Sequence, residues 1–171
     1  MTTEERRKAI GELLAGSSVP ISATTLARKF SVSRQVIVSD VALLRAGGMA
    51  ISATPRGYVT TQHQDGLIRT VACVHTLDDM RKELYAIVDN GCSALDVVVE
   101  HPIYGQLTGE LQLASRYDVD RFMEKLSRRA SPLSALTGGI HLHTLRCPDE
   151  AAYVRVLEAL RAEGILLDEK A

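Results

Sequence analysis

Two histidines separated by one residue are the feature of this 171-residue sequence that most suggests chemistry. His141 and His143 alternate with apolar residues from Ile140 onward, which is the pattern of a β-strand. Alternate side chains of a strand share one face, so the two imidazoles would point the same way and could chelate a metal ion. The competing interpretation is a half-buried strand whose two polar residues face solvent. The pair by itself favours neither interpretation.

Two further residues could complete a metal site with this pair. His75 ends a predicted strand, and Glu83 follows eight residues later, two turns into a predicted helix. If the strands that carry His75 and His141 were neighbours, three imidazoles and one carboxylate would meet. Such a set suits zinc, nickel, iron or manganese, with coordination positions left open to water or an oxygen ligand. Taken singly, His75 and Glu83 are more typical of solvent-facing positions.

The elements that would position these residues follow the order βαββαβα. Apolar periodicity predicts strands over 67–74, 95–100 and 106–113, the His141 strand, helices over 77–90 and 119–129, and a last helix that begins after Asp149 and ends at Ala162. This order folds most readily as an α+β open sandwich, a sheet with helices on one face. We therefore predict that the metal residues lie in one such domain, over residues 67–171.

The first 60 residues have a different organisation. They predict helices over 3–15, 23–29 and 34–45, followed by two short alternating runs over 49–53 and 57–60. Thr3, Ser22 and Ser33 are suited to cap the three helices, and residues 31–33 form a tight turn before the third. Three helices and a hairpin in this arrangement are a winged helix-turn-helix. Residues 61–66 lack apolar periodicity and are predicted to be a linker.

Residues 26–45 resemble the biotin-repressor-like class of bacterial regulators. In a helix-turn-helix, the start of the recognition helix reaches base edges in the major groove, while basic residues around it contact phosphates. Arginine pairs naturally with guanine and glutamine with adenine. A solvated basic face that mediates protein contacts is the alternative. The residues expected at DNA are Ser33, Arg34 and Gln35 for bases, Arg28, Lys29 and Arg45 for phosphates, and Arg56 at the wing tip.

Charge and composition agree with two domains of different function. Residues 1–63 carry eight basic and four acidic side chains, whereas residues 64–171 carry twelve and seventeen. A basic first domain is typical of a module that meets an anion. No apolar run approaches the ~20 residues that span a bilayer, and the N-terminus has no signal-peptide pattern. The sequence thus predicts a cytoplasmic protein without a membrane partner.

The three cysteines are odd in number and far apart in the sequence. Cys73, Cys92 and Cys147 form no Cys-x-x-Cys pair, so we expect reduced thiols and no disulfide framework. Cys73 lies two residues before His75 and shares its predicted strand face. A thiolate at this position could join the metal ligands, although a buried cysteine more often packs as a small apolar side chain.

Motifs in the second half carry a more specific resemblance. His75 followed by Glu83, the stretch His101-Pro102-Ile103-Tyr104-Gly105 and residues 138–143 resemble the three-histidine domain of niacin-responsive transcriptional repressors. The resemblance also covers the winged-helix half and the order of the two domains. It implies a homodimer that binds operator DNA and controls genes of NAD biosynthesis and niacin uptake. It also implies nicotinic acid as co-repressor.

The resemblance further implies one divalent transition metal per chain, nickel or zinc in the first place and iron or manganese in the second. Its ligands would be His75, Glu83, His141 and His143, and nicotinate would lie near His101 and Tyr104. A metal-sensing repressor, in which the ion is the effector, is the main alternative. A metal-dependent hydrolase is disfavoured, because no general base lies near a nucleophile motif and Glu83 is already assigned as a ligand. We therefore expect that the chain is not an enzyme.

Overall fold

The computed structural model describes residues 1–60, 66–129 and 131–168, except for the side chains of 127–129. The chain divides into two compact units, residues 1–64 and 65–171. Residues 61–65 of the predicted linker lie outside the described residues.

The N-terminal unit is a winged helix-turn-helix. Its elements are α1 (Thr3–Ala15), α2 (Ala23–Phe30), α3 (Arg34–Ala46), β1 (Ile51–Thr54) and β2 (Gly57–Thr60). Apolar side chains from all three helices and the wing form its core, with Ile10, Leu14, Leu26, Ile37 and Val41 almost fully buried. The predicted caps are confirmed for α2 and α3, since Ser22 accepts from Thr25 N and Ser33 from Val36 N.

The predicted cap of the first helix is wrong by one residue. Thr2, and not Thr3, caps α1, because its hydroxyl accepts from the backbone of Glu5 while the Glu5 carboxylate accepts from the backbone of Thr2. This reciprocal pair is a capping box, which satisfies two backbone donors together.

The wing is anchored to the loop before α2. Tyr58 exchanges two backbone hydrogen bonds of 2.9 Å with Ile21, which adds a short third strand to the β1–β2 hairpin. Gly57 has φ +138°, and a Cβ there would lie 2.5 Å from the Ile21 carbonyl. The close approach of the two chains therefore requires glycine at the start of β2.

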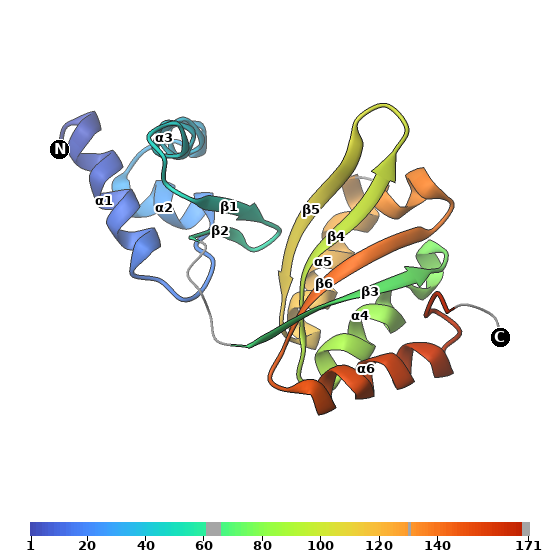
Figure 1. Ribbon diagram of the computed structural model, residues 1–171. Coiled ribbons are helices and arrows are strands. Elements are labelled where there is room, and N and C mark those ends of the chain that lie inside the picture. The colour runs from blue at the N-terminus through green and yellow to red at the C-terminus, as the bar shows by residue number, and fades with distance from the viewer. Residues whose placement is uncertain (61–65, 130, 169–171) are drawn as a thin grey trace. The chain divides into compact units, whose positions relative to one another are not determined.

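The C-terminal unit is an antiparallel sheet with helices packed on one face (Figure 1). Its regular elements are β3 (Leu67–Val74), α4 (Met80–Asp89), β4 (Ser93–His101), β5 (Gly105–Leu113), α5 (Arg116–Arg129), β6 (Ile140–Cys147) and α6 (Glu150–Ala162). Two 3-10 turns, Leu77–Asp79 and Leu133–Thr137, precede α4 and β6. The spatial strand order is β3-β6-β4-β5. The predicted α+β class and the order βαββαβα are confirmed.

The central position of β6 decides where the functional residues lie. The last strand of the sequence is inserted between β3 and β4, so β3, which His75 directly follows, and the strand of His141 are neighbours. After α6 the chain returns to the free edge of β3, where Leu167 N donates to Ala72 O and Val74 N donates to Ile165 O, each at 2.9 Å. This return pairs part of an otherwise open sheet edge.

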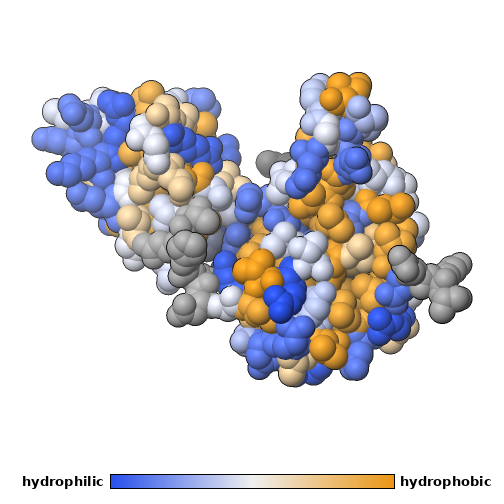
Figure 2. All heavy atoms as spheres, viewed as in Figure 1, coloured by the Kyte–Doolittle hydropathy of each residue, from blue (hydrophilic) through white to orange (hydrophobic). Residues whose placement is uncertain are grey.

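The first half of β6 presents its polar residues inward, ahead of the buried Leu145 and Cys147. His141 and His143 are each 3% exposed beneath the helices, whereas Ile140 and Leu142 are 50% and 39% exposed on the opposite face. Ile68 of β3 is also exposed, and hydrophobic residues spread over the C-terminal unit as Figure 2 shows. The shared face of the imidazoles is confirmed, and the interpretation that they face solvent is wrong.

The expectation of reduced cysteines is also wrong for two of the three. Cys92 and Cys147 form a buried disulfide across 55 residues of sequence. The register of β4 and β6 brings them together, because the neighbouring residues Ser93 and Arg146 are paired. Cys73 is free and buried. Within the part of the chain described here, no helix has the length and apolarity to cross a membrane.

Candidate metal centre and DNA-binding surface

The candidate metal centre is built on two adjacent strands. β3 and β6 run antiparallel, with Cys73 opposite His141 and Val71 opposite His143. His75 extends this pairing beyond the last residue of β3, since its N–H donates to Gly139 O at 3.4 Å. The residues that alternate along each strand face α4, and the imidazoles of all three histidines are consequently directed beneath that helix.

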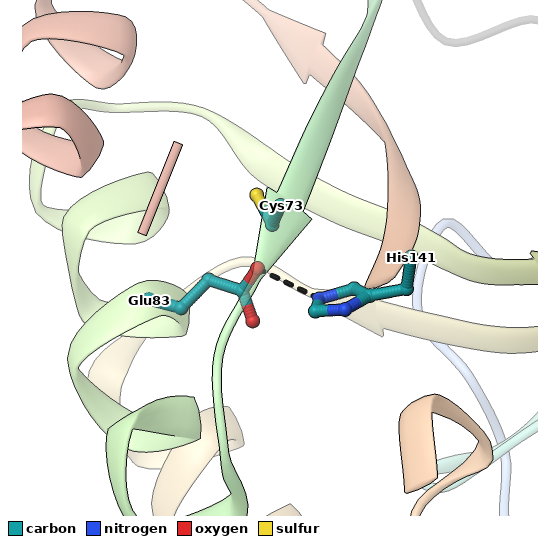
Figure 3. A group of neighbouring side chains, drawn as sticks. All are labelled: Cys73, Glu83 and His141. Carbon is teal, nitrogen blue, oxygen red and sulfur yellow. Dashed lines mark hydrogen bonds and ion pairs between the residues drawn. The ribbon is translucent and has the colours of Figure 1, made fainter. Parts of the chain in front are cut away.

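Glu83 reaches this cluster from α4. Its Oε2 lies 2.7 Å from His75 Nε2 and 3.3 Å from His143 Nε2, and its Oε1 lies 2.9 Å from His141 Nε2 (Figure 3 shows the last pair). The Glu83 side chain is 1% exposed, within a helix face that also buries Met80, Leu84 and Ile87. The structure thus brings together the four residues that the sequence nominated as metal ligands.

The orientation of the three rings is set by main-chain carbonyls. Each Nδ1 lies 2.6–2.8 Å from a carbonyl oxygen, His75 with Thr76, His141 with Gly139 and His143 with Asp96. A carbonyl only accepts, so Nδ1 carries the hydrogen and a neutral ring has its lone pair on Nε2. Three Nε2 lone pairs directed at one carboxylate repel it unless a proton or a metal ion lies between them. The cluster therefore requires a cation, either a proton or a metal ion, between the imidazoles and the carboxylate.

The electrostatics of the cluster also favour positive charge on the imidazoles and negative charge on Glu83. Burial opposes protonation of His143, but the charge of Glu83 and the hydrogen bond to it outweigh burial and raise the pKa of His143. The same two effects raise the pKa of His75 against burial. Burial alone would raise the pKa of Glu83, yet attraction to His143 and hydrogen bonds from the three imidazoles hold it well below its usual range. Burial, followed by the charge of Glu83, raises the pKa of the Cys73 thiol.

Two residues that support the rings were not identified as site residues from the sequence. Asp96 lies at an irregularity in β4, where its carbonyl accepts from His143 and its carboxylate accepts from Thr144 N at 2.9 Å. Gly139 has φ +93°, and its carbonyl accepts from His141. The Gly138-Gly139 pair marks an unusual backbone in the sequence, whereas Asp96 has no comparable signal.

The residues predicted to contact the effector lie in the β4–β5 turn. His101 ends β4, and its Nδ1 accepts from the backbone N–H groups of Ile103 and Tyr104, each at 3.2 Å. The rings of His101 and Tyr104 lie 5.1 Å apart, and Tyr104 is 75% exposed. The turn is thus organised by His101, and Tyr104 is not buried in a pocket.

The residues predicted at DNA lie on α2, on α3 with its N-cap, and on the wing. Those exposed at the end of α2, the start of α3 and the hairpin turn are Arg28, Lys29, Ser33, Arg34, Gln35 and Arg56. Arg45 has a structural contact in addition, because its Nε donates to Ile51 O at 2.8 Å and its guanidinium lies 5.8 Å from the Tyr58 ring centre.

A buried ion pair that the sequence did not reveal holds the recognition helix α3. Asp40 is 2% exposed, and its carboxylate accepts from Arg6 of α1 at 2.7 Å and 3.3 Å. Asp40 lies between Ile37 and Val41 on the buried face of α3. An acid within an apolar stripe is the signal that would have found it.

Comparisons with known proteins agree with both units. Residues 6–59 match the family model of an HTH domain, and residues 68–169 match that of a 3H domain. The chain is similar to the probable transcription repressor NiaR of Thermotoga maritima, with 42% identity over 167 residues, which cover 97% of this chain and 95% of that protein. It is also similar to the transcription repressor NadR of Bacillus subtilis, with 43% identity over 162 residues, 91% of this chain and 89% of that protein.

The chain belongs to the NiaR-type family of transcription repressors. The family resemblance stated from its motifs is thereby confirmed. Because these relatives are named as repressors, the expectation that the chain is not an enzyme is confirmed as well. As a NiaR-type repressor with a helix-turn-helix domain, it has double-stranded DNA as its partner.

Proposed function

We propose that this NiaR-type repressor is a cytoplasmic homodimer that senses nicotinic acid through a metal centre and represses genes of NAD biosynthesis and niacin uptake. The observation that carries the proposal is the convergence of three Nε2 atoms on the Glu83 carboxylate, at 2.7–3.3 Å, inside the second domain. A repressor that only bound DNA would have no need for this buried, cation-demanding cluster.

The donor set fits a divalent transition metal. His75, Glu83, His141 and His143 would hold one ion per chain, with the three Nδ1–H groups kept in place by carbonyls as in established histidine sites. Three nitrogens and one oxygen suit nickel or zinc, and also iron or manganese. When bound, the ion supplies a positive centre that can accept the carboxylate of nicotinate, and this preference favours nicotinic acid over nicotinamide.

DNA recognition is assigned to the first domain. Ser33, Arg34 and Gln35 begin the recognition helix and would meet base edges. Basic residues around them would contact phosphates and supply affinity without sequence choice, namely Arg28, Lys29, Arg45 and Arg56. In a dimer the two recognition helices must match half-sites about one helical turn apart, so an effector that changes their relative placement changes operator affinity. His101 and Tyr104 are proposed as effector contacts from the hairpin turn.

One observation favours a second candidate, a repressor whose effector is the ion itself. The side chains of the four proposed ligands are only 1–4% exposed, which encloses the site against a ligand larger than an ion. In this case DNA affinity would respond to the metal and not to nicotinate.

Two measurements test the proposal. Metal analysis of the purified protein and of the double variant His141→Ala/His143→Ala should show about one ion per chain and none, respectively; stoichiometric metal in the variant would refute the site. Titration of the metal-loaded protein with nicotinate, in the presence of its operator, should tighten DNA binding, with nicotinamide as the control. A response to metal but not to nicotinate would support the metal sensor instead.

A further inference from the structure

A further donor atom lies beside two of the four proposed ligands, Glu83 and His141. Cys73 is directly opposite His141 in the β3–β6 ladder and two residues before His75, on the same strand face. It is a free cysteine with no exposed surface. Its sulfur, a Glu83 carboxylate oxygen and a ring nitrogen of His141 all lie within 4.8 Å of one another. Figure 3 shows the sulfur on the strand beside the carboxylate that His141 contacts.

These distances are close to the size of a metal coordination sphere. With zinc–sulfur bonds of roughly 2.3 Å and zinc–nitrogen or zinc–oxygen bonds of roughly 2.1 Å, two ligands are at most about 4.4 Å apart, when they lie on opposite sides of one ion, and roughly 3–4 Å apart otherwise. Donor atoms that lie within 4.8 Å of one another would therefore bind one ion after a shift of up to about 1–2 Å toward it.

The thiol lies where the apolar core meets the polar cluster. Most buried cysteines fill apolar space, and Cys73 is itself part of the hydrophobic core of the domain. Its sulfur, however, also lies beside the buried carboxylate of Glu83 and a ring nitrogen of His141. A thiol at this boundary can pack against the core and still offer its sulfur to an ion.

We propose that Cys73 is a fifth ligand of the metal centre, an inference that rests on the proposed metal site. When the ion enters, the Cys73 thiol loses its proton to solvent and its sulfur bonds to the metal, without oxidation or reduction. A sulfur donor added to nitrogen and oxygen donors favours softer ions, so the site would prefer zinc, cobalt or nickel over manganese. Cys73 would therefore determine the class of metal to which this repressor responds.

Cobalt(II) is the probe that separates sulfur ligation from the other four ligands. The full-length, metal-free protein is titrated with Co²⁺ without thiol reductant, and its absorption spectrum is recorded. Bands in the visible region report cobalt held by nitrogen and oxygen, and a sulfur-to-cobalt charge-transfer band in the near ultraviolet reports a bound thiolate. The variants are Cys73→Ala and the nearly isosteric Cys73→Ser. The matched control is Cys92→Ala/Cys147→Ala, which removes the other two cysteine sulfurs.

We expect both sets of bands in the wild type and in the control. In the two Cys73 variants the visible bands should persist while the charge-transfer band is lost, and the preference for zinc over manganese in competition should fall. Visible bands without a charge-transfer band in the wild type would overturn the role of Cys73 and leave the metal centre intact. Persistence of that band in the Cys73 variants would also overturn it. If no protein showed cobalt bands, the proposed metal centre and this inference would fail together.

Discussion

Gly139 provides the most direct test of how the backbone supports the metal centre. It has φ +93°, and a Cβ at this position would lie 2.3 Å from the carbonyl oxygen of His75. Contacts of this kind below 3.0 Å are essentially never seen, so in Gly139→Ala the two strands must separate by at least about 0.7 Å. The strand end that would move carries His75, and the Gly139 carbonyl that orients His141 would move with it.

The expected effect has two parts. A non-glycine residue with positive φ is destabilised by roughly 1–2 kcal/mol, and forcing extra volume into a packed site by roughly 1–3 kcal/mol more. We therefore expect Gly139→Ala to lower the free energy of unfolding by about 2–5 kcal/mol. Loss of a group that orients a metal ligand typically weakens metal binding by roughly 10–100-fold, and we expect this range here.

The neighbouring glycine is the matched control. Gly138 has φ +63°, but a Cβ there would meet nothing within 4 Å. Gly138→Ala should therefore show only the conformational part, about 1–2 kcal/mol, with metal affinity close to that of the wild type. Urea denaturation of the metal-free proteins measures stability, and competition with a chromophoric chelator measures zinc and nickel affinity. Equal metal affinities in the Gly138 and Gly139 variants would show that the strand contact does not support the site.

Three other predictions concern the cluster, the strand and the wing. In metal-free protein the cluster should stabilise the fold up to about pH 6.5, the unfolded pKa of histidine. The contribution of His143 is lost as the pH rises through its raised folded pKa, and that of Glu83 is lost as the pH falls through its lowered folded pKa. Glu83→Gln should flatten this profile of denaturation midpoint against pH, and an unchanged profile would contradict the assigned interactions. Leu145→Ala, at a fully buried position of β6, should lower the free energy of unfolding by roughly 2–5 kcal/mol, whereas Leu142→Ala, at a position 39% exposed, should lower it by less than about 1 kcal/mol. Equal losses of unfolding free energy in the two variants would mean that the faces of β6 are misassigned. Arg45→Ala should lower the stability of the winged domain by about 1 kcal/mol without DNA, because its guanidinium holds the first strand of the wing, and a thermal midpoint equal to that of the wild type would leave phosphate contact as its sole role.

The local elements could be predicted because their causes are local. β3 spans 67–74 and α1 spans 3–15, as apolar spacing predicted, and Ser22 and Ser33 cap their helices as serine does in general. Even the error at α1 is small, since Thr2 and Thr3 are adjacent and only the reciprocal bond to Glu5 distinguishes them.

Contacts between distant residues could not be predicted in the same way. Cys92 and Cys147 become neighbours only through the register of β4 with β6, and Asp40 finds Arg6 only once α1 packs against α3. The position of Asp96 beside His143 depends on an irregularity in β4, for which its own sequence carries no signal.

The His-x-His strand illustrates the difference between what the sequence determined and what the tertiary structure decided. Alternation in the sequence determined that His141 and His143 share one face of a strand, because the side-chain period of a strand is two residues. Whether that face is buried depended on a partner from elsewhere. Glu83 of α4 contacts the imidazoles from the helix side, so the two histidines are buried and Ile140 remains on the open side. The residues of the candidate metal centre, Cys73 among them, could thus be identified in the sequence, whereas their enclosure and the orientation of the rings were decided by tertiary packing.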